Sequence, residues 1–365
     1  MGDNKIVIIS DPLLNEFGSC RPAILIAQEL VSRNYDVKII TLNITRRLQK
    51  ILENQGITVK ALQSRKSILP YSLMWFKSWL MEALFSMNSR KVKDVEGLKL
   101  NFSNVICLPS DFWYAQGPPS ITLDNIKSSF SLPYKFVYHL GRPFFRFVDM
   151  RNSKKFYALS GKVISNSRYL QEIYERFGIR VYKVIYPPID CSKFKPLSSN
   201  PVSDYVITYF GKETDLCVIK RLADMGVKIK VFGSKLKTPH VIKKHPNIDS
   251  LGVISEQTLV ELYSNALITL YPFLDEPFGY VPIESMACGT PVLTYNCQGP
   301  KETVIHGVSG WLTNSREEFI KSAIKIWREG YPQRMRRECR ERAMLFDKKT
   351  IAEEWTNNIK PNVAG

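Results

Sequence analysis

The feature that most constrains the fold is a strand, loop, helix and strand pattern that occurs twice. The apolar run Lys5–Ser10 predicts a buried strand, Ile24–Arg33 has the periodicity of an amphipathic helix, and Asp36–Thr41 predicts a second strand. The pattern returns with predicted strands at Tyr205–Phe210 and Val227–Phe232. Because a strand, a crossover helix and a strand at this spacing form a βαβ unit, we expect two α/β halves with parallel sheets.

The length of 365 residues agrees with two domains, because one hydrophobic core rarely covers so long a chain. The hydrophobic content of 44% and the charged content of 23% are those of a globular protein and exclude a largely disordered chain. The stretch Phe194–Ser203 is rich in proline and serine, and we expect it to link the halves. The predicted domains are therefore residues 1–193 and residues 204–344.

The cysteines and histidines give no sign of a metal site. The seven cysteines are dispersed, odd in number and without a Cys-x-x-Cys pair, which favours reduced thiols in a cytoplasmic protein. The four histidines lack metal-ligand spacing, and no Asp-x-Asp motif suits a divalent ion. The start, MGDNKIVIIS, has no basic region followed by an apolar signal core. We therefore expect a cytoplasmic protein that needs no metal and no resident cofactor.

The net charge of +17 favours an anionic partner, such as nucleic acid, a membrane surface or a phosphorylated substrate. The segment Ile68–Met87 nearly has the length of a membrane span, but Lys77 and Glu82 interrupt it. Trp75 and Trp79, which lie in it between basic clusters, suit the headgroup level of an anionic bilayer. Packing of both tryptophans in the core of the first domain is the equal alternative. The surface interpretation predicts peripheral contact with an anionic membrane.

The stretch Tyr271–Val304 predicts a strand ending at Tyr271, a loop, and a short helix from Gly279 to Cys288. The first N–H groups of a helix lack internal partners, so this helix start is a ready anion site. Glu276 lies just ahead of it and Glu284 lies within the helix. Carboxylates accept hydrogen bonds, as a pair of sugar hydroxyls requires. The alternative is an ordinary strand–helix–strand unit with solvated acids.

A family resemblance is carried by EPFGYVPIESMACGTPV, in which seven residues separate Glu276 from Glu284, and by the GPKETV that follows. In this order the motifs resemble the donor-site signature of the GT-B glycosyltransferases of family 4. The segments KFVYHLGRP, KVISNSRYLQEIYERFG and KVIYPPID resemble the end of that family's acceptor domain and the start of its linker. The resemblance implies a GT-B fold, an α/β arrangement of two Rossmann-like domains with parallel sheets facing across a cleft. It also implies that a helix within residues 345–365 crosses back onto the first domain.

The resemblance further implies a retaining glycosyltransferase that moves a sugar from a UDP- or GDP-linked donor to a glycan or a lipid-linked acceptor. In this family Glu276 would contact the donor sugar and Glu284 the ribose hydroxyls, and His139 would lie near the reacting centre. His139 and Glu276 are the predicted catalytic residues. The predicted donor-binding residues are Gly18, Lys212, Lys220, Ile254, Phe278, Gly279, Tyr280, Val281 and Glu284.

Physical arguments support one of these assignments, and the match to the family pattern is incomplete for others. Tyr134–His139 and Asn104–Leu108 are predicted buried strands, and ligands bind at the carboxyl ends of parallel strands, which would place His139 at the site. Lys212 matches the first cation that holds the diphosphate, whereas Lys220 falls later than the family's second cation. Gly18 is a single glycine where the family has a pair, and a plain turn is an equal alternative.

Two other functions are compatible with parts of the sequence. A nucleotide-sugar epimerase of similar architecture would use acids and histidines for proton abstraction, but the Glu276-x7-Glu284 signature disfavours it. A nucleic-acid-binding protein would explain the charge of +17, yet would not need the donor signature. We therefore expect no nucleic-acid partner.

Overall fold

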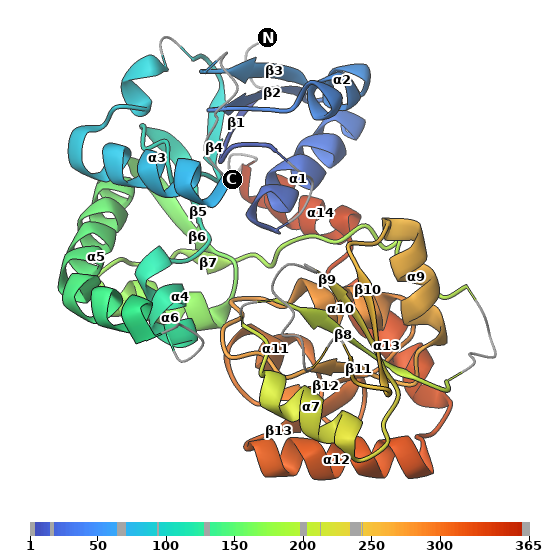
Figure 1. Ribbon diagram of the computed structural model, residues 1–365. Helices are drawn as coiled ribbons and strands as arrows, with labels where there is room; N and C mark the ends of the chain where they lie inside the picture. The colour runs from blue at the N-terminus through green and yellow to red at the C-terminus, as the bar shows by residue number, and fades with distance from the viewer. Residues whose placement is uncertain are drawn as a thin grey trace. The chain divides into compact units, whose positions relative to one another are not determined.

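The computed structural model describes residues 4–14, 18–63, 71–92, 95–127, 132–197, 203–211, 213–233, 242 and 244–359. The chain divides into two compact units. The first contains Met1–Asp124, Ser131–Pro188 and Lys348–Gly365, and the second contains Asn125–Phe130 and Ile189–Asp347. Each unit is built around a parallel sheet of its own (Figure 1).

In the first unit, seven strands of the described residues pair in the order β3-β2-β1-β4-β5-β6-β7, and all are parallel. The strands are β1 (Lys5–Ser10), β2 (Asp36–Thr41), β3 (Thr58–Ala61), β4 (Leu98–Asn101), β5 (Ser110–Ala115), β6 (Ser160–Ser165) and β7 (Lys183–Val184). The helices are η1 (Gly18–Cys20), α1 (Arg21–Ser32), α2 (Arg46–Asn54), α3 (Tyr71–Phe85), η2 (Ser89–Lys91), α4 (Pro119–Ile126), α5 (Leu132–Ala158), α6 (Arg168–Arg176) and α14 (Lys348–Ile359).

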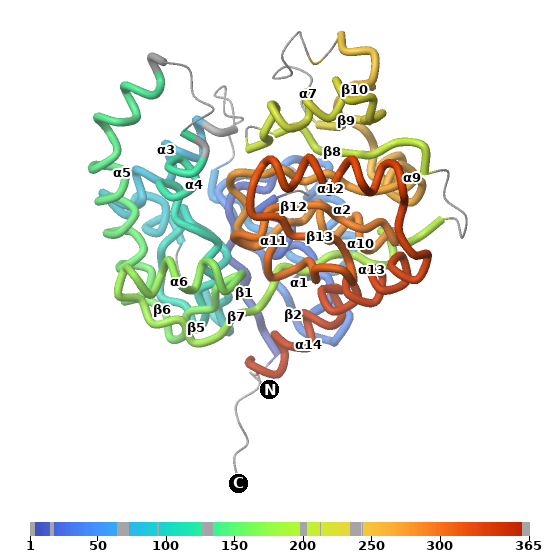
Figure 2. Tube along the Cα trace, turned by 90° about the horizontal axis from the view of Figure 1, so that it is seen from below, coloured from blue at the N-terminus to red at the C-terminus, as the bar shows by residue number. Residues whose placement is uncertain are grey.

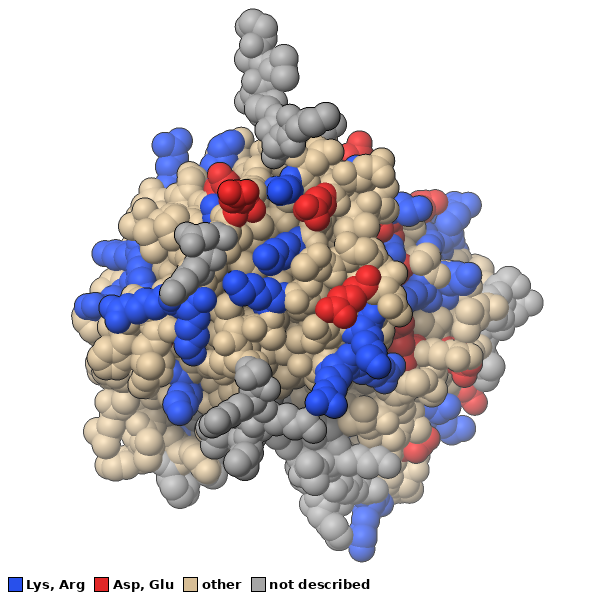
Figure 3. Space-filling view, turned by 90° about the horizontal axis from the view of Figure 1, so that it is seen from above, with Lys and Arg blue, Asp and Glu red and all other residues tan. Residues whose placement is uncertain are grey.

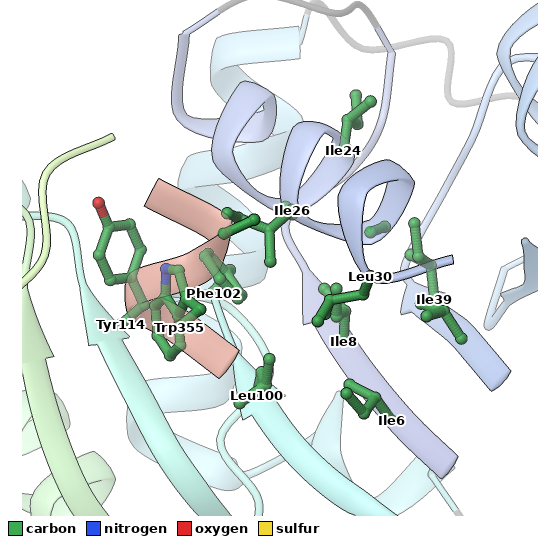
Figure 4. Close-up of a cluster of buried hydrophobic side chains, with 14 of the residues drawn as sticks. Ile6, Ile8, Ile24, Ile26, Leu30, Ile39, Leu100, Phe102, Tyr114 and Trp355 are labelled. Carbon is green, nitrogen blue, oxygen red and sulfur yellow. The ribbon is translucent and has the colours of Figure 1, made fainter. Parts of the chain in front are cut away.

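The alternation of side chains along β1 divides the core of this unit between two faces. Ile6 and Ile8 pack with α1 and α14 on one face, whereas Val7 and Ile9 pack with α3 on the other. On the first face the Trp355 ring of α14 lies against Phe102 and Tyr114, with ring centroids 5.3 and 5.6 Å apart (Figure 4). Because Trp355 is 1% exposed, α14 is anchored to the first unit, where it lies beside α1 (Figure 2).

In the second unit, six strands of the described residues pair in the order β10-β9-β8-β11-β12-β13, again in parallel. The strands are β8 (Val206–Phe210), β9 (Ile229–Gly233), β10 (Ile248–Gly252), β11 (Thr269–Tyr271), β12 (Val292–Tyr295) and β13 (Gly310–Thr313). The helices are α7 (Leu216–Asp224), α9 (Glu256–Asn265), α10 (Tyr280–Ala287), α11 (Gln298–Thr303), α12 (Arg316–Glu329) and α13 (Arg334–Met344).

Helices cover both faces of this second sheet. Leu222 of α7 and Phe319 of α12 join one core, while α10 packs against α9 and α13. The Arg336 guanidinium of α13 is buried and donates to the carbonyl oxygens of Ser264 and Ala266 at 2.5 and 3.2 Å. Arginine therefore fixes α13 to the end of α9, although the surrounding basic sequence resembles a solvated helix.

The predicted architecture is confirmed, since both expected βαβ units are present and both sheets are parallel. The predicted strand Tyr134–His139 is wrong, because these residues lie inside the 27-residue helix α5. Its buried residues, among those the structure describes, are Tyr138, Val148, Asp149, Asn152, Ser153 and Phe156. From Val148 onward they recur at spacings of three and four, which follow the turns of a helix.

The predicted strand Asn104–Leu108 is also wrong, because these residues form a buried loop between β4 and β5. The Ser103 hydroxyl accepts hydrogen bonds from the N–H groups of Val105 and Ile106, both at 3.0 Å. The Asn101 side chain donates to the Ile106 carbonyl oxygen at 3.0 Å. Short polar side chains therefore satisfy the backbone locally and replace the hydrogen bonds of a strand.

Of the two tryptophans of α3, Trp79 belongs to the core of the first unit and Trp75 packs half-buried against it, which agrees with the second alternative. Trp79 is 1% exposed, and the Trp75 indole N–H donates to Oδ2 of the buried Asp11 at 2.8 Å. Glu82 is fully buried and accepts from the N–H groups of Asn88 and Cys107 at 2.7 and 3.1 Å. Among the described residues, no helix combines the length and the apolar character needed to cross a membrane.

Candidate active site

The order of strands in the second unit defines where a ligand fits. The first strand of the unit, β8, lies between β9 and β11, so the direction in which the chain adds strands reverses between β8 and β11. In open parallel sheets, ligands bind outside the carboxyl ends of the strands at such a reversal. Gly211 follows β8 there, and Pro272 follows β11.

Hydrogen bonds hold the loops after β8 and β11 together. The Asp215 N–H donates to the Pro272 carbonyl oxygen at 2.8 Å, and the Leu274 N–H donates to that of Glu213 at 2.9 Å. The Thr214 hydroxyl accepts from the Gly211 N–H at 2.9 Å, which closes the first loop on itself. Lys212, the predicted diphosphate ligand, belongs to this loop and lies outside the described residues.

Helix α10 starts at this edge of the sheet. Its N-cap residue, Gly279, has a φ of +103°, a conformation that glycine adopts without strain. Gly289, which follows the helix, has a φ of +81° and supplies the predicted termination. Tyr280 and Val281, both half-buried, form the first turn, whose N–H groups have no carbonyl partner within the helix.

Glu276 folds back onto the start of α10. Its Oε1 accepts hydrogen bonds from the N–H groups of Gly279 at 2.9 Å and Phe278 at 3.2 Å, and Oε2 accepts a short hydrogen bond from the Tyr271 hydroxyl. Burial raises the pKa of this carboxyl to about 7, although these hydrogen bonds act in the opposite direction. Near neutral pH, Glu276 can therefore both accept and donate a hydrogen bond.

The loop that carries Glu276 is held from the other side by the start of α11. The Gln298 side-chain oxygen accepts from the Glu276 N–H at 2.7 Å, and the Gly299 N–H donates to the Glu276 carbonyl oxygen at 3.0 Å. A Cβ atom on Gly299 would lie 2.4 Å from the N and Cα atoms of Phe278. Only glycine therefore allows these backbones to approach so closely.

Sequence reasoning did not assign Tyr271, Gln298 or Gly299 to the site. The sequence holds a signal for Gly299, because this residue is the first of the GPKETV segment that carries part of the family resemblance. The contributions of Tyr271 and Gln298 depend on how β11 and α11 pack in space. No local pattern in the sequence indicates either one.

The remaining predicted donor residues of the second unit differ in exposure. Glu284 lies in the second turn of α10 and is 5% exposed, one turn beyond Tyr280 on the same side of the helix. Phe278 is 2% exposed and packs its ring against those of Tyr280 and Phe346, so its side chain is part of the core. Ile254 is half-buried in the turn after β10, at the same edge of the sheet.

Of the other predicted residues, one lies on a helix of the second unit and two belong to the first unit. Lys220 is half-buried and pairs at 2.7 Å with Asp224, toward the C-terminal end of α7. Gly18 belongs to the first unit, where it is exposed, with a φ of +62° and no atom within 4 Å of a built Cβ. His139 is exposed in the interior of α5, so the expectation that it ends a strand is wrong.

Comparisons with known proteins agree with this geometry. Residues 220–345 match the family model of the glycosyl transferases group 1. The chain is 40% identical over 85 residues, 22% of its length and 18% of the relative's, to an alpha-1,3/1,6-mannosyltransferase of Neurospora crassa. It is 26% identical over 223 residues, 55% of its length, to a GDP-mannose-dependent phosphatidylinositol dimannoside mannosyltransferase of Mycobacterium tuberculosis. The matches span 18% and 58% of the two relatives.

Solved structures resemble nearly the whole chain. HepE of Anabaena, solved with UDP and glucose, matches with a TM-score of 0.68 and 17% identity, covering 97% of this chain and 99% of HepE. A sucrose-phosphate synthase of Thermosynechococcus elongatus matches with a TM-score of 0.69 and 17% identity over 97% and 98% of the two chains. The fold is thus that of the GT-B proteins. Within that class, residues 220–345, which include the signature around α10, are similar to the group 1 glycosyltransferases.

Proposed function

We propose that the protein is a glycosyltransferase that binds a nucleotide sugar at the carboxyl edge of the second sheet and transfers the sugar to an acceptor. The observation that carries the proposal is that α10 starts at the edge of the sheet where the strand order reverses. The Glu276 carboxylate accepts a hydrogen bond from the Gly279 N–H at this helix start, and Glu284 lies one turn further along the helix. The mannosyltransferase relatives and the family model support the same reaction.

The proposed chemistry follows from charge. Breaking the bond between the anomeric carbon and the phosphate oxygen leaves a nucleoside diphosphate with developing negative charge. The N–H groups of Tyr280 and Val281, at the positive end of the helix dipole, would stabilise that charge, and Lys212 would contribute a cation. We propose that this stabilisation needs no metal ion and that the anomeric configuration is retained.

The two glutamates would divide the recognition of the donor. Glu284 would accept hydrogen bonds from the ribose hydroxyls, and its buried position in α10 makes it a rigid acceptor. Glu276 would face the sugar, and with a pKa of about 7 it can hold a proton that a sugar oxygen accepts. Either UDP or GDP would serve as the nucleotide, with a glycan or a lipid-linked molecule as the acceptor.

We also propose contact with an anionic membrane surface, which the net charge of +17 supports. On the face shown in Figure 3, lysine and arginine side chains are scattered among neutral ones and are more frequent than aspartate and glutamate. A scattered charge attracts the protein to an anionic surface without orienting it. A docking face therefore requires a local combination of apolar and basic residues.

The test is release of nucleoside diphosphate from a panel of UDP- and GDP-sugars, with wild-type protein and the variants Glu276→Ala and Glu284→Ala. Glu284→Ala should mainly weaken nucleotide binding, and Glu276→Ala should mainly lower turnover. Glu261→Ala, on the exposed side of α9, is the matched control and should behave as wild type. Wild-type rates in both folded site variants would refute the assignment.

The products separate the rival functions. An epimerase would convert the nucleotide sugar without releasing nucleoside diphosphate, and a glycosyltransferase releases it in step with transfer. A nucleic-acid-binding protein would bind DNA with an affinity that falls steeply as salt rises and would not turn over any nucleotide sugar.

A further inference from the structure

Helix α5 of the first unit has an apolar face directed away from its own core. Phe136, Leu140, Phe144 and Phe147 are 68%, 67%, 48% and 52% exposed. Their spacings of four, four and three residues place them on one stripe of the helix, opposite the buried Tyr138 and Phe156. Soluble proteins rarely expose a contiguous apolar stripe of this kind unless it binds something.

The charge on the same helix indicates which kind of partner fits. Continuing the stripe by four and then three residues reaches Arg151 and Lys154, both exposed. The helix sequence contains six lysines and arginines and one acidic residue, Asp149, which is 1% exposed. The exposed face is therefore apolar and aromatic over its first half and basic over its second half, with no acidic residue of its own.

This distribution fits the boundary of an anionic bilayer. Phenylalanine and leucine side chains enter the boundary between headgroups and acyl chains, and lysine and arginine meet anionic headgroups. A second copy of the chain is a weaker fit, because its α5 would present the same cations and no exposed acid to meet them. An acid-poor helix face would also repel a basic partner protein.

The position of the helix agrees with a docking role. Figure 1 shows α5 along one side of the first unit, next to α3. The inner side of α5 is fixed to the unit by Phe156, which stacks on Trp113 at 5.0 Å, and by the contact of Phe145 with Phe76 at 5.8 Å. Two arginines, Arg142 and Arg146, pair with Asp124 at 2.6 and 2.5 Å and hold the middle of the helix. The exposed stripe is thus presented by a rigid element.

We propose that α5 is a membrane-docking helix that binds the surface of an anionic bilayer through Phe136, Leu140, Phe144 and Phe147, with Arg151 and Lys154 on the headgroups. Of the tryptophans of α3, which the sequence suggested for this role, Trp79 is buried and Trp75 is half-buried against the core, and the docking face lies on the neighbouring helix instead. The proposal gives a location to the membrane contact proposed above and is independent of the donor site.

The experiment is flotation of the full chain with vesicles of phosphatidylcholine alone and of phosphatidylcholine mixed with phosphatidylglycerol. Wild-type protein should float with the mixed vesicles only, and less at high salt. The double variant Phe136→Ser with Leu140→Ser should bind about a hundredfold more weakly, since each of the two apolar side chains in the boundary is worth about a factor of ten. Arg151→Glu with Lys154→Glu should abolish the preference for mixed vesicles.

The matched control is Leu197→Ser with Met225→Ser, which changes two apolar residues of the second unit that are 52% and 49% exposed. It should float as wild type does. If the Phe136 and Leu140 variant melts early, Phe144→Ser alone provides the same comparison. Nucleoside diphosphate release from a nucleotide sugar should be unchanged in all of these variants, so a failure of docking is distinguished from a failure of the proposed reaction.

Three results would overturn the proposal. The first is no flotation of wild-type protein with either kind of vesicle, and the second is equal flotation of the Phe136 and Leu140 variant. The third is a wild-type dimer that the same variant converts to a monomer without any vesicle binding, because that would assign the face to a second copy.

Discussion

Gly299→Ala tests whether the loop around Glu276 positions the donor. In the folded protein, the new Cβ would lie 2.4 Å from two backbone atoms of Phe278 and 2.5 Å from the Pro277 carbonyl carbon. An ordinary contact of a Cβ atom is at least 3.4 Å, so one of the two backbones must move by about 1 Å. Neither contact is with a flexible side chain, and the strain therefore falls on the loop itself.

The expected effects are a moderate loss of stability and a larger loss of turnover. Overpacking of this kind costs about 1–3 kcal/mol in the free energy of unfolding. A displacement of about 1 Å at a catalytic group costs on the order of a hundredfold in rate. Glu276 also makes its two backbone hydrogen bonds through this segment, at 2.7 and 3.0 Å, and both would lengthen.

Thermal unfolding gives the stability, and nucleoside diphosphate release at saturating donor gives the turnover. Gly307→Ala is the control, because Gly307 has a φ of +76° and no atom within 4 Å of a built Cβ. That change should cost on the order of 1 kcal/mol through backbone strain and leave turnover unaltered. A Gly299→Ala protein with wild-type turnover and donor affinity would refute the claim that this contact sets the position of Glu276.

Three further predictions follow from the same structure. The pKa of Glu276 is raised from 4.5 to about 7, so ionisation disfavours the folded state and wild-type stability should fall as the pH rises through that window. The difference corresponds to at most about 3 kcal/mol, and screening of this half-buried group reduces it to on the order of 1–2 kcal/mol. Glu276→Gln should therefore have the wild-type free energy of unfolding below pH 4.5 and a higher one at pH 8. If the difference in free energy of unfolding between Glu276→Gln and wild type is the same at both pH values, the assigned pKa is wrong. Trp79→Ser should cost about 3–5 kcal/mol in thermal unfolding because Trp79 is 1% exposed, whereas Phe85→Ser, at a position 53% exposed on the same helix, should cost little. Donor turnover should survive EDTA, because the helix dipole supplies the positive potential; a complete loss that only magnesium or manganese restores would show that a metal takes part.

The sequence predicted the two sheets well, because each βαβ unit is a local pattern of apolar periodicity and turn residues. It also located the start of α10 within one residue, since Gly279 and Gly289 have conformations that glycine favours. In both cases the evidence lies within a few residues of the element. Local patterns of this kind do not depend on how distant segments pack.

The errors have equally physical causes. In α5, aromatic residues occupy both the buried and the exposed sides of the helix, so Tyr134–His139 has the aromatic and β-branched residues typical of a strand. Only the packing against α3 shows which stripe is inside. The hydrogen bonds of Glu276 with Tyr271 and with Gln298 join residues from different elements, and no periodicity in the sequence reveals such contacts.

The central claim is that a nucleotide sugar binds at the start of α10, and amide hydrogen exchange tests it most directly. Wild-type protein would be compared with and without each member of the panel of UDP- and GDP-sugars. We predict that at least one of them slows exchange in residues 274–284 and 298–303 of the wild-type protein and does not slow it there in Glu284→Ala. Protection confined to the first unit, or none with any nucleotide sugar at millimolar concentration, would contradict the account.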